Sequence, residues 1–194
     1  TTECDGCSSG RYSARQGMVR PACDKCPEGY AQRLTNQSGC DICLPGLYAK
    51  ESGQSVCRSC AAGSFAGTAG ESFGCKACPR GYYQPSNESM SCLPCLPGEF
   101  GNGTGLKSCF KCDIGKVSES SNASTCSKCT IGRSSDAEGG AKCTSCPAGQ
   151  FSNASGSSCK ACPHGFYQES TGNSSCLKIP TGAIALSRGA AKVQ

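Results

Sequence analysis

The chain has 194 residues, a net charge of +5 and a mean hydropathy of −0.35. Leu, Ile, Val and Phe together account for 23 residues, about 12% of the chain, which is fewer than a globular domain normally needs to form a stable core. The 19 Lys and Arg residues are scattered without a basic block that would point to a nucleic acid, and no apolar run is long enough to span a membrane. A weak attraction to acidic polysaccharide stays open.

Pairs of cysteines separated by two residues recur about every seventeen residues. A fixed short period is typical of a repeat array, in which each unit is too small to fold alone and packs on its neighbours. Ten such pairs precede a lone Cys176: Cys4/Cys7, Cys23/Cys26, Cys40/Cys43, Cys57/Cys60, Cys75/Cys78, Cys92/Cys95, Cys109/Cys112, Cys126/Cys129, Cys143/Cys146 and Cys159/Cys162.

Each repeat shows the same order of predicted elements. The third residue after the second cysteine is always glycine, and an aromatic residue follows two positions later in seven repeats (Tyr12, Tyr48, Phe65, Tyr83, Phe100, Phe151 and Tyr167). These positions predict a turn and a short extended segment, and the polar stretch after them predicts a second turn and a return strand. The sequence therefore predicts a small disulfide-rich fold: an elongated tandem array of about ten 17-residue repeats of short β-hairpins and turns, with almost no helix and no single globular core.

Asparagine indicates the compartment. All six Asn residues lie in N-x-Ser/Thr sequons: Asn36, Asn87, Asn102, Asn122, Asn153 and Asn173. Cysteines at this density imply either disulfides in an oxidising compartment or zinc ligands in a reducing one. The sequons favour disulfides and predict N-glycosylated surface turns in an extracellular or cell-surface protein of the secretory pathway. A string of Cys4 zinc sites is the alternative chemistry, and ten similar pairs argue against a single redox-active C-x-x-C.

The odd number of cysteines bears on their pairing. Cys176 is left over if each pair closes on itself, whereas Cys4 is left over if the second cysteine of one pair bonds the first cysteine of the next. The C-terminal end favours the second scheme, because Ile179 occupies the next second-cysteine position while Pro180 and Gly182 keep their offsets. Bonds from first to first and from second to second cysteines stay open as a further arrangement. The favoured scheme gives Cys7–Cys23, Cys26–Cys40, Cys43–Cys57, Cys60–Cys75, Cys78–Cys92, Cys95–Cys109, Cys112–Cys126, Cys129–Cys143, Cys146–Cys159 and Cys162–Cys176.

The pattern C-P-x-G-x-Y, a polar turn and C-x-x-C resembles the cysteine-rich repeats of the ephrin-receptor-like class. Those repeats are similar to the leading loop of tumour necrosis factor receptor cysteine-rich domains. The resemblance covers residues 4 to about 184, and it implies a disulfide between the cysteines that flank each long loop. Such repeats occur in receptor ectodomains, secreted mosaic proteins and surface proteins of protists and algae, so the resemblance implies a module rather than one function.

Two neighbouring repeats, within residues 112–146, depart from this pattern. They lack the proline, and Val117 and Ser134 stand in the aromatic position. Ile114 and Ile131, one residue before the glycine in these repeats alone, are expected to supply a substitute apolar contact. We expect this stretch to be the most flexible part of the chain or one that faces a partner.

Residues 1–176 are predicted as the tandem repeats, and residues 177–194 as a degenerate last repeat and linker that leads into a further domain. The chain begins Thr1-Thr2-Glu3, without an initiator Met or a signal peptide, so we expect a mature chain or a window of a longer secreted protein. His164, the one histidine, is expected to be an exposed spacer. The sequence predicts no enzyme, no cofactor and no metal site.

Two classes of function fit such an array. The first is a stiff extracellular spacer or filament-forming segment, whose partners are copies of itself, other extracellular proteins and N-linked glycans, with no nucleic acid. The second is a receptor-type ectodomain that binds a protein ligand. The positions that vary between repeats are mostly Ser, Gly and Lys. This composition favours the spacer, because binding surfaces concentrate large aromatic side chains. The receptor alternative depends on the rings outside the repeat position, which are Tyr30, Phe73, Tyr82, Phe110 and Phe166.

Overall fold

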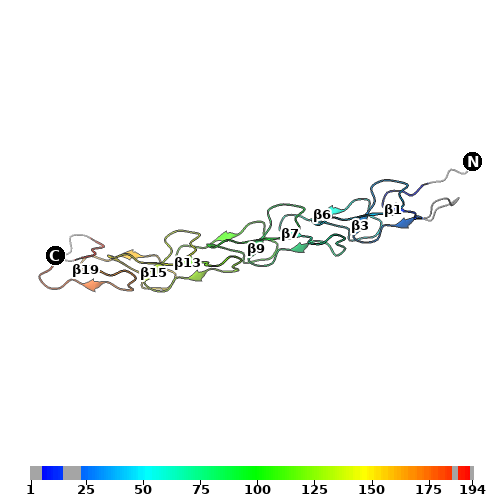
Figure 1. The fold of residues 1–194 in the computed structure, drawn as a ribbon. Helices are drawn as coiled ribbons and strands as arrows, with labels where there is room; N and C mark the ends of the chain where they lie inside the picture. The colour runs from blue at the N-terminus through cyan, green and yellow to red at the C-terminus, as the bar shows by residue number, and fades with distance from the viewer. Residues whose placement is uncertain (1–5, 15–22, 185–187, 193–194) are drawn as a thin grey trace, which may run out of the picture. The chain divides into compact units, whose positions relative to one another are not determined.

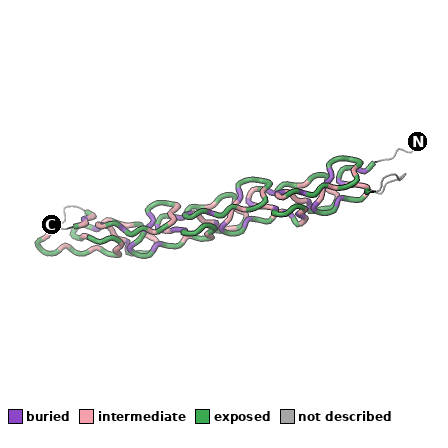
Figure 2. Tube along the Cα trace, viewed as in Figure 1, coloured by how far each residue is buried: buried purple, intermediate pink, exposed green. Residues whose placement is uncertain are grey.

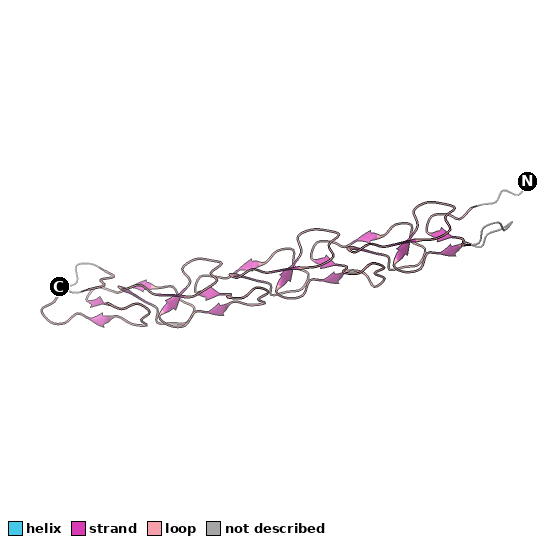
Figure 3. Ribbon diagram, viewed as in Figure 1, coloured by secondary structure: helices cyan, strands magenta, loops and turns pink. Residues whose placement is uncertain are grey.

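The computed structural model describes residues 6–14, 23–184 and 188–192. Its regular structure is a series of two-residue β-strands joined in pairs by loops (Figures 1 and 3). The described part of the chain contains no helix, and therefore no helix that could cross a membrane. The hairpins are β1 (Arg11–Tyr12) with β2 (Asp24–Lys25), β3 (Tyr30–Ala31) with β4 (Asp41–Ile42), β5 (Leu47–Tyr48) with β6 (Arg58–Ser59), β7 (Ser64–Phe65) with β8 (Lys76–Ala77), β9 (Tyr82–Tyr83) with β10 (Leu93–Pro94), β11 (Glu99–Phe100) with β12 (Phe110–Lys111), β13 (Lys116–Val117) with β14 (Ser127–Lys128), β15 (Arg133–Ser134) with β16 (Thr144–Ser145), β17 (Gln150–Phe151) with β18 (Lys160–Ala161), and β19 (Phe166–Tyr167) with β20 (Leu177–Lys178).

Each hairpin combines parts of two successive cysteine pairs. Its first strand directly follows the glycine of one repeat, and its second strand consists of the two residues between the cysteines of the next pair. In β11 and β12, for example, Phe100 pairs with Phe110 in an antiparallel register, and their ring centroids are 5.8 Å apart. The structure confirms the predicted fold class in its short hairpins, its tandem repeats and the lack of helix in the described residues.

The chain divides into two compact units. The first contains residues 1–93 and 104–108, and the second contains residues 94–103 and 109–194. The segment 104–108 belongs to the first unit because the polar turn at the tip of each repeat lies on the repeat before it. Gly105 donates its backbone N–H to the carbonyl oxygen of Cys78 at 2.8 Å, and Leu106 accepts a backbone hydrogen bond from Gln84 at 3.0 Å.

Burial recurs at the same point of each repeat instead of gathering in one core (Figure 2). The second cysteine of every described pair is at most 4% exposed. The rings in the aromatic position are only half-buried on their short strands. The interior of each repeat is therefore mainly its disulfide, as expected for a chain with so few apolar residues.

Candidate functional site

Ten disulfides connect successive cysteine pairs. Each joins the second cysteine of one pair to the first cysteine of the next, over Cα–Cα distances from 5.5 to 5.9 Å. The bonds are Cys7–Cys23, Cys26–Cys40, Cys43–Cys57, Cys60–Cys75, Cys78–Cys92, Cys95–Cys109, Cys112–Cys126, Cys129–Cys143, Cys146–Cys159 and Cys162–Cys176. Cys4 lies outside the described residues. Within them, no group of three or more His, Cys, Asp or Glu side chains is placed to hold a metal ion.

The turn glycine, the third residue after the second cysteine, meets one structural requirement in every repeat and a second one in eight repeats. Its φ is positive, for example +81° at Gly29 and +87° at Gly98. A methyl group at Gly29 would also overlap the backbone carbonyl of Gly70, and one at Gly98 would overlap that of Gly139. In both cases the overlapping carbonyl belongs to the repeat two positions further along the array. Glycine is needed both for its backbone conformation and for the close approach of a distant repeat.

Within each compact unit, backbone hydrogen bonds join successive repeats. Gly115 donates its N–H to the carbonyl oxygen of Ser135 at 2.9 Å and accepts at its own carbonyl oxygen from the N–H of Cys129 at 2.8 Å. Equivalent bonds occur in both units, for example between Gly46 and Ala66 at 2.8 Å. Because these bonds use only main-chain atoms, they can form whatever side chains the neighbouring positions carry.

A second position with positive φ lies at the tip of each repeat, ten residues after the second cysteine. Its backbone N–H donates to the carbonyl oxygen of the second cysteine of the preceding repeat, as from Gly139 to Cys112 at 2.8 Å. The positive φ of this tip position was not predicted from the sequence, although glycine recurs there at a constant spacing. Its occupants are Asn36, Gly53, Gly70, Glu88, Gly105, Asn122, Gly139, Gly156, Gly172 and Gly189.

Ile179 takes the backbone place of a second cysteine. Its N–H donates to the carbonyl oxygen of Gly165 at 3.0 Å, as the N–H of Cys162 does to Gly149 in the repeat before. Ten residues later, Gly189 donates to the carbonyl oxygen of Cys162 at 3.0 Å. The inter-repeat contacts therefore continue as far as residue 189 without a cysteine in that slot.

The sequon asparagines all lie in the loops of the hairpins. Asn36, Asn87, Asn102, Asn122 and Asn153 are exposed, whereas Asn173 is half-buried and donates from its Nδ2 to the carbonyl oxygen of Ser170 at 3.0 Å. The side-chain oxygen of Asn87 accepts a hydrogen bond at 2.9 Å from the backbone of Ala62, in the preceding repeat. Five of the six predicted acceptors are thus open to solvent in the folded chain.

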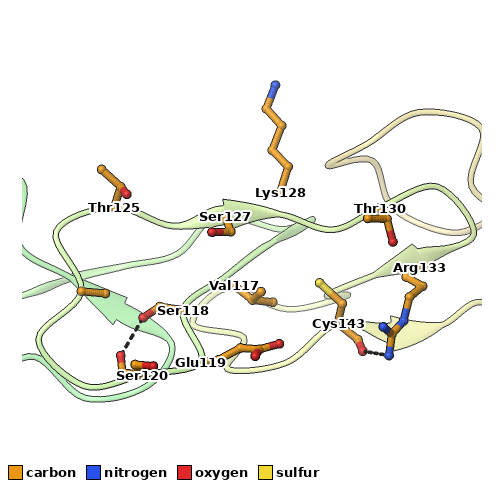
Figure 4. A pocket seen from close by; sticks show the side chains of 11 residues that line it. Val117, Ser118, Glu119, Ser120, Thr125, Ser127, Lys128, Thr130, Arg133 and Cys143 are labelled. Atoms are coloured by element: carbon orange, nitrogen blue, oxygen red, sulfur yellow. Dashed lines mark hydrogen bonds between the residues drawn. The ribbon is translucent and has the colours of Figure 1, made fainter.

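A groove of about 480 Å³ opens beside the two repeats that lack both the proline and the aromatic ring, which we call the ring-less repeats (Figure 4). Val117 and Ser134 fill the aromatic position there and are almost completely buried, at 4% and 0% exposure. Ser134 Oγ has no hydrogen-bond partner among the described residues. The groove is lined by Val117, Ser118, Glu119, Ser120, Ala123, Thr125, Ser127, Lys128, Thr130, Arg133 and Cys143.

Arg133 is held at the edge of this groove, where its guanidinium donates to the carbonyl oxygen of Cys143 at 3.0 Å. The Lys128 side chain, in contrast, extends away from the other labelled side chains in Figure 4. Hydroxyl groups supply most of the remaining polar atoms. Val117 and Ser134 are smaller than the rings they replace, which leaves an open groove whose lining is partly polar and partly apolar.

The prediction that Ile114 and Ile131 supply an apolar contact in place of the missing rings is wrong. These side chains are 47% and 55% exposed. They stand in the turn before the glycine, and this turn position also points outward at His164, which is exposed. The side chains that occupy the vacated ring positions are Val117 and Ser134 themselves.

Comparison with known families supports the resemblance inferred from the motif. A family described as tyrosine-protein kinase ephrin type A/B receptor-like matches residues 63–112 and 149–194. The matched segments lie on either side of the two repeats that lack the ring. A comparison with curated proteins gives no match. Repeats of this class are a non-catalytic type of module. The chain therefore contains ephrin-receptor-like cysteine-rich repeats.

Proposed function

We propose that this chain is a stiff extracellular spacer, N-glycosylated and held by its disulfides, within a larger cell-surface or filament-forming protein of the sheath or flagellar-hair type. The observation that carries the proposal is the backbone contact, within each compact unit, of a repeat with the next two, as at Gly98, whose turn lies against the tip at Gly139. A repeat held by both neighbours bends less easily than one joined by a single linker.

The compartment supports this function. Ten disulfides and ephrin-receptor-like repeats indicate an extracellular or secreted protein. The exposed sequon asparagines would carry glycans around the spacer, which keep neighbouring surfaces apart and soluble. Partners are then copies of the same chain or other extracellular proteins.

Small-angle X-ray scattering on the secreted, glycosylated chain tests stiffness. We expect a radius of gyration well above the roughly 16 Å of a compact 194-residue domain, together with a single well-defined cross-section. A compact particle or a profile of flexibly linked beads would contradict the spacer. Sedimentation over a range of concentrations then shows whether copies associate with one another.

A receptor-type ectodomain is the second candidate function, and two observations favour it. The groove beside the ring-less repeats is one, and Phe73, which is 89% exposed, is the other. The extra residue in the longer tip after Cys60 provides room for this ring, and the Glu71 carboxylate accepts a hydrogen bond at 3.3 Å from the Phe73 N–H. A fully exposed phenylalanine on an ordered turn is suited to anchoring a partner.

Substitutions at Phe73 and in the groove distinguish the spacer function from the receptor function. Phe73→Ser removes the exposed ring, and Ser127→Trp fills the groove. If a soluble protein partner is captured by the native chain and lost with either variant, the receptor function is supported. If neither variant changes any interaction and the scattering profile stays the same, the spacer function is supported.

A further inference from the structure

Lysine and arginine occupy the strands between paired cysteines in a regular order. Seven of these ten strands carry one such residue. Lys25 stands alone in the first of them, and in three further places two successive strands of this kind each carry one. The three cation pairs are Arg58 with Lys76, Lys111 with Lys128, and Lys160 with Lys178. The uncharged strands after the first two pairs are Leu93–Pro94 and Thr144–Ser145.

The cation pairs are presented to solvent from fixed backbone. Each of the six side chains is exposed, although its neighbours in sequence are disulfide-bonded cysteines and it lies in a hydrogen-bonded strand. A ligand that binds such residues does not have to order the main chain, which lowers the entropic cost of binding. Both members of a pair belong to the same compact unit, so their hairpins are joined by the backbone contacts described above.

Packing also restrains the aliphatic parts of these side chains. A methyl group at Gly156 would touch Cγ and Cδ of Lys128, and one at Gly139 would touch the same atoms of Lys111. Arg58 stands directly across its hairpin from Tyr48, a ring that can support the alkyl stem. The charged ends are therefore carried outward on stems whose freedom is already reduced.

No carboxylate neutralises these charges within the described residues. The one ion pair found there, Lys116 with Asp113 at 2.7 Å, involves none of the six. Lys128 lies directly across its hairpin from Lys116, so two ammonium groups share one short strand pair. Like charges in this register destabilise a sheet. Asp113 offsets the charge of Lys116, whereas Lys128 has no acidic partner among the described residues.

We propose that the cation pairs bind a sulfated or carboxylated extracellular polysaccharide, with one anionic segment at each pair. Each exposed contact alone is weak, but three sites on one chain act together on a linear polyanion. The uncharged strands Leu93–Pro94 and Thr144–Ser145 separate the sites. This inference needs an extracellular location but does not require the array to be stiff, so it can fail independently of the spacer function.

The test uses the full glycosylated chain and two variants of equal net charge. In the first, all six residues of the cation pairs are changed to Gln. In the matched control, six other exposed cations are changed to Gln: Arg33, Lys50, Arg80, Lys107, Lys142 and Lys192. Both variants keep the cysteines, turn glycines and tip positions, and non-reducing peptide mapping checks their disulfides.

Binding is measured at physiological ionic strength to immobilised heparin, polygalacturonate and neutral dextran, and to vesicles that contain phosphatidylserine. We expect the native chain to bind heparin or polygalacturonate, the cation-pair variant to bind at least about tenfold more weakly, and the control to change less than about threefold. Equal losses in the two variants would show that only net charge matters and would overturn the proposal. Binding to dextran as strong as to the anionic chains, or to the vesicles alone, would also overturn it.

Discussion

Two positions in each repeat are limited by the backbone more than by packing. The turn glycine and the tip position both have positive φ, and both lie where a neighbouring repeat touches main-chain atoms. At most turn glycines a side chain would overlap a backbone carbonyl group, whereas at the tip glycines it would meet mainly the side chains of a neighbouring repeat. Asn36 and Asn122 are accepted at the tip because asparagine tolerates this conformation better than most residues.

Gly29→Ala should destabilise the chain by more than about 1 kcal/mol, because alanine is strained at positive φ and its methyl group would overlap the Gly70 carbonyl. Gly39→Ala is the matched control, since Gly39 has open space around it and no positive φ. Denaturant unfolding with the disulfides intact measures both. A control that loses as much stability as Gly29→Ala would contradict the steric argument.

Glu88→Gly should stabilise the chain by about 0.5–1 kcal/mol, because Glu88 has a φ of +56° at a tip position that most repeats fill with glycine. Its backbone hydrogen bond to Cys60 is retained by glycine. Glu51→Gly serves for comparison, since Glu51 is exposed and has ordinary φ, and it should be neutral or slightly destabilising. Thermal unfolding of both variants distinguishes the two effects.

A hairpin in this protein is too short to be stable alone. Two residues a strand bury little surface, and a two-stranded sheet is at best marginal in water. The disulfide closes the loop of each hairpin. The cysteine at the start of that loop, such as Cys112, also carries the backbone groups that bind the neighbouring repeats. The same cysteine therefore forms the crosslink and the backbone contact with the neighbouring repeats.

Replacing both Cys112 and Cys126 by Ser should cost about 3 kcal/mol, the value for closing a loop of about 15 residues. Because Cys112 accepts from Gly139 and donates to Gly98, the loss should reach the neighbouring repeats and fade beyond them. Hydrogen exchange read by mass spectrometry should show lost protection around residues 98–139 and unchanged protection near Cys43. Uniform loss along the chain would argue against coupling limited to nearby repeats.

The hairpins, the lack of helix and the turn glycine could be predicted because they depend on local chemistry at a fixed spacing. Cysteines two residues apart leave room for only two strand residues, and an invariant glycine marks a turn. The contact of that glycine with a repeat two positions on could not be predicted, since sequence does not show which distant carbonyl comes close. The same limit explains Ile114 and Ile131, whose apolar character suggested burial although the turn directs this position outward.

The groove and the cation pairs could be predicted only in part from the sequence. Small residues at 117 and 134 marked the ring-less repeats, but a missing ring does not say whether neighbours close the space or leave it open. The groove is open because Val117 and Ser134 lie beneath the surface without replacing the volume of a ring. The cation pairs could be listed from the sequence, whereas their exposure and lack of acidic partners required the structure.

At the scale of the whole molecule, stability is distributed along the array. No segment has a core that could hold the others, so cooperativity comes from disulfides and from contacts between successive repeats. The two compact units follow the same rules, and the tip at 104–108 is grouped with the repeats on which it packs.

Full reduction under otherwise native conditions should therefore unfold the protein, because too little apolar surface remains to order the chain. Hydrogen exchange should become fast throughout, and scattering should take the form of an expanded chain. Air oxidation after slow removal of the reductant provides the comparison. A reduced chain that kept its exchange protection would show that burial outside the disulfides had been underestimated.

The main-chain character of the repeat interface has a consequence for how such a protein can vary. Each interface presents the same donors and acceptors on one side and their complements on the other, whatever side chains surround them. Whole repeats can be removed or duplicated without creating a mismatched junction. An insertion between the turn glycine and the tip position would break their constant spacing, whereas the extra residue in the loop after Cys60 lies beyond the tip and leaves it intact. The length of the array can therefore change by whole repeats, while the exposed side chains of each repeat are free to diverge.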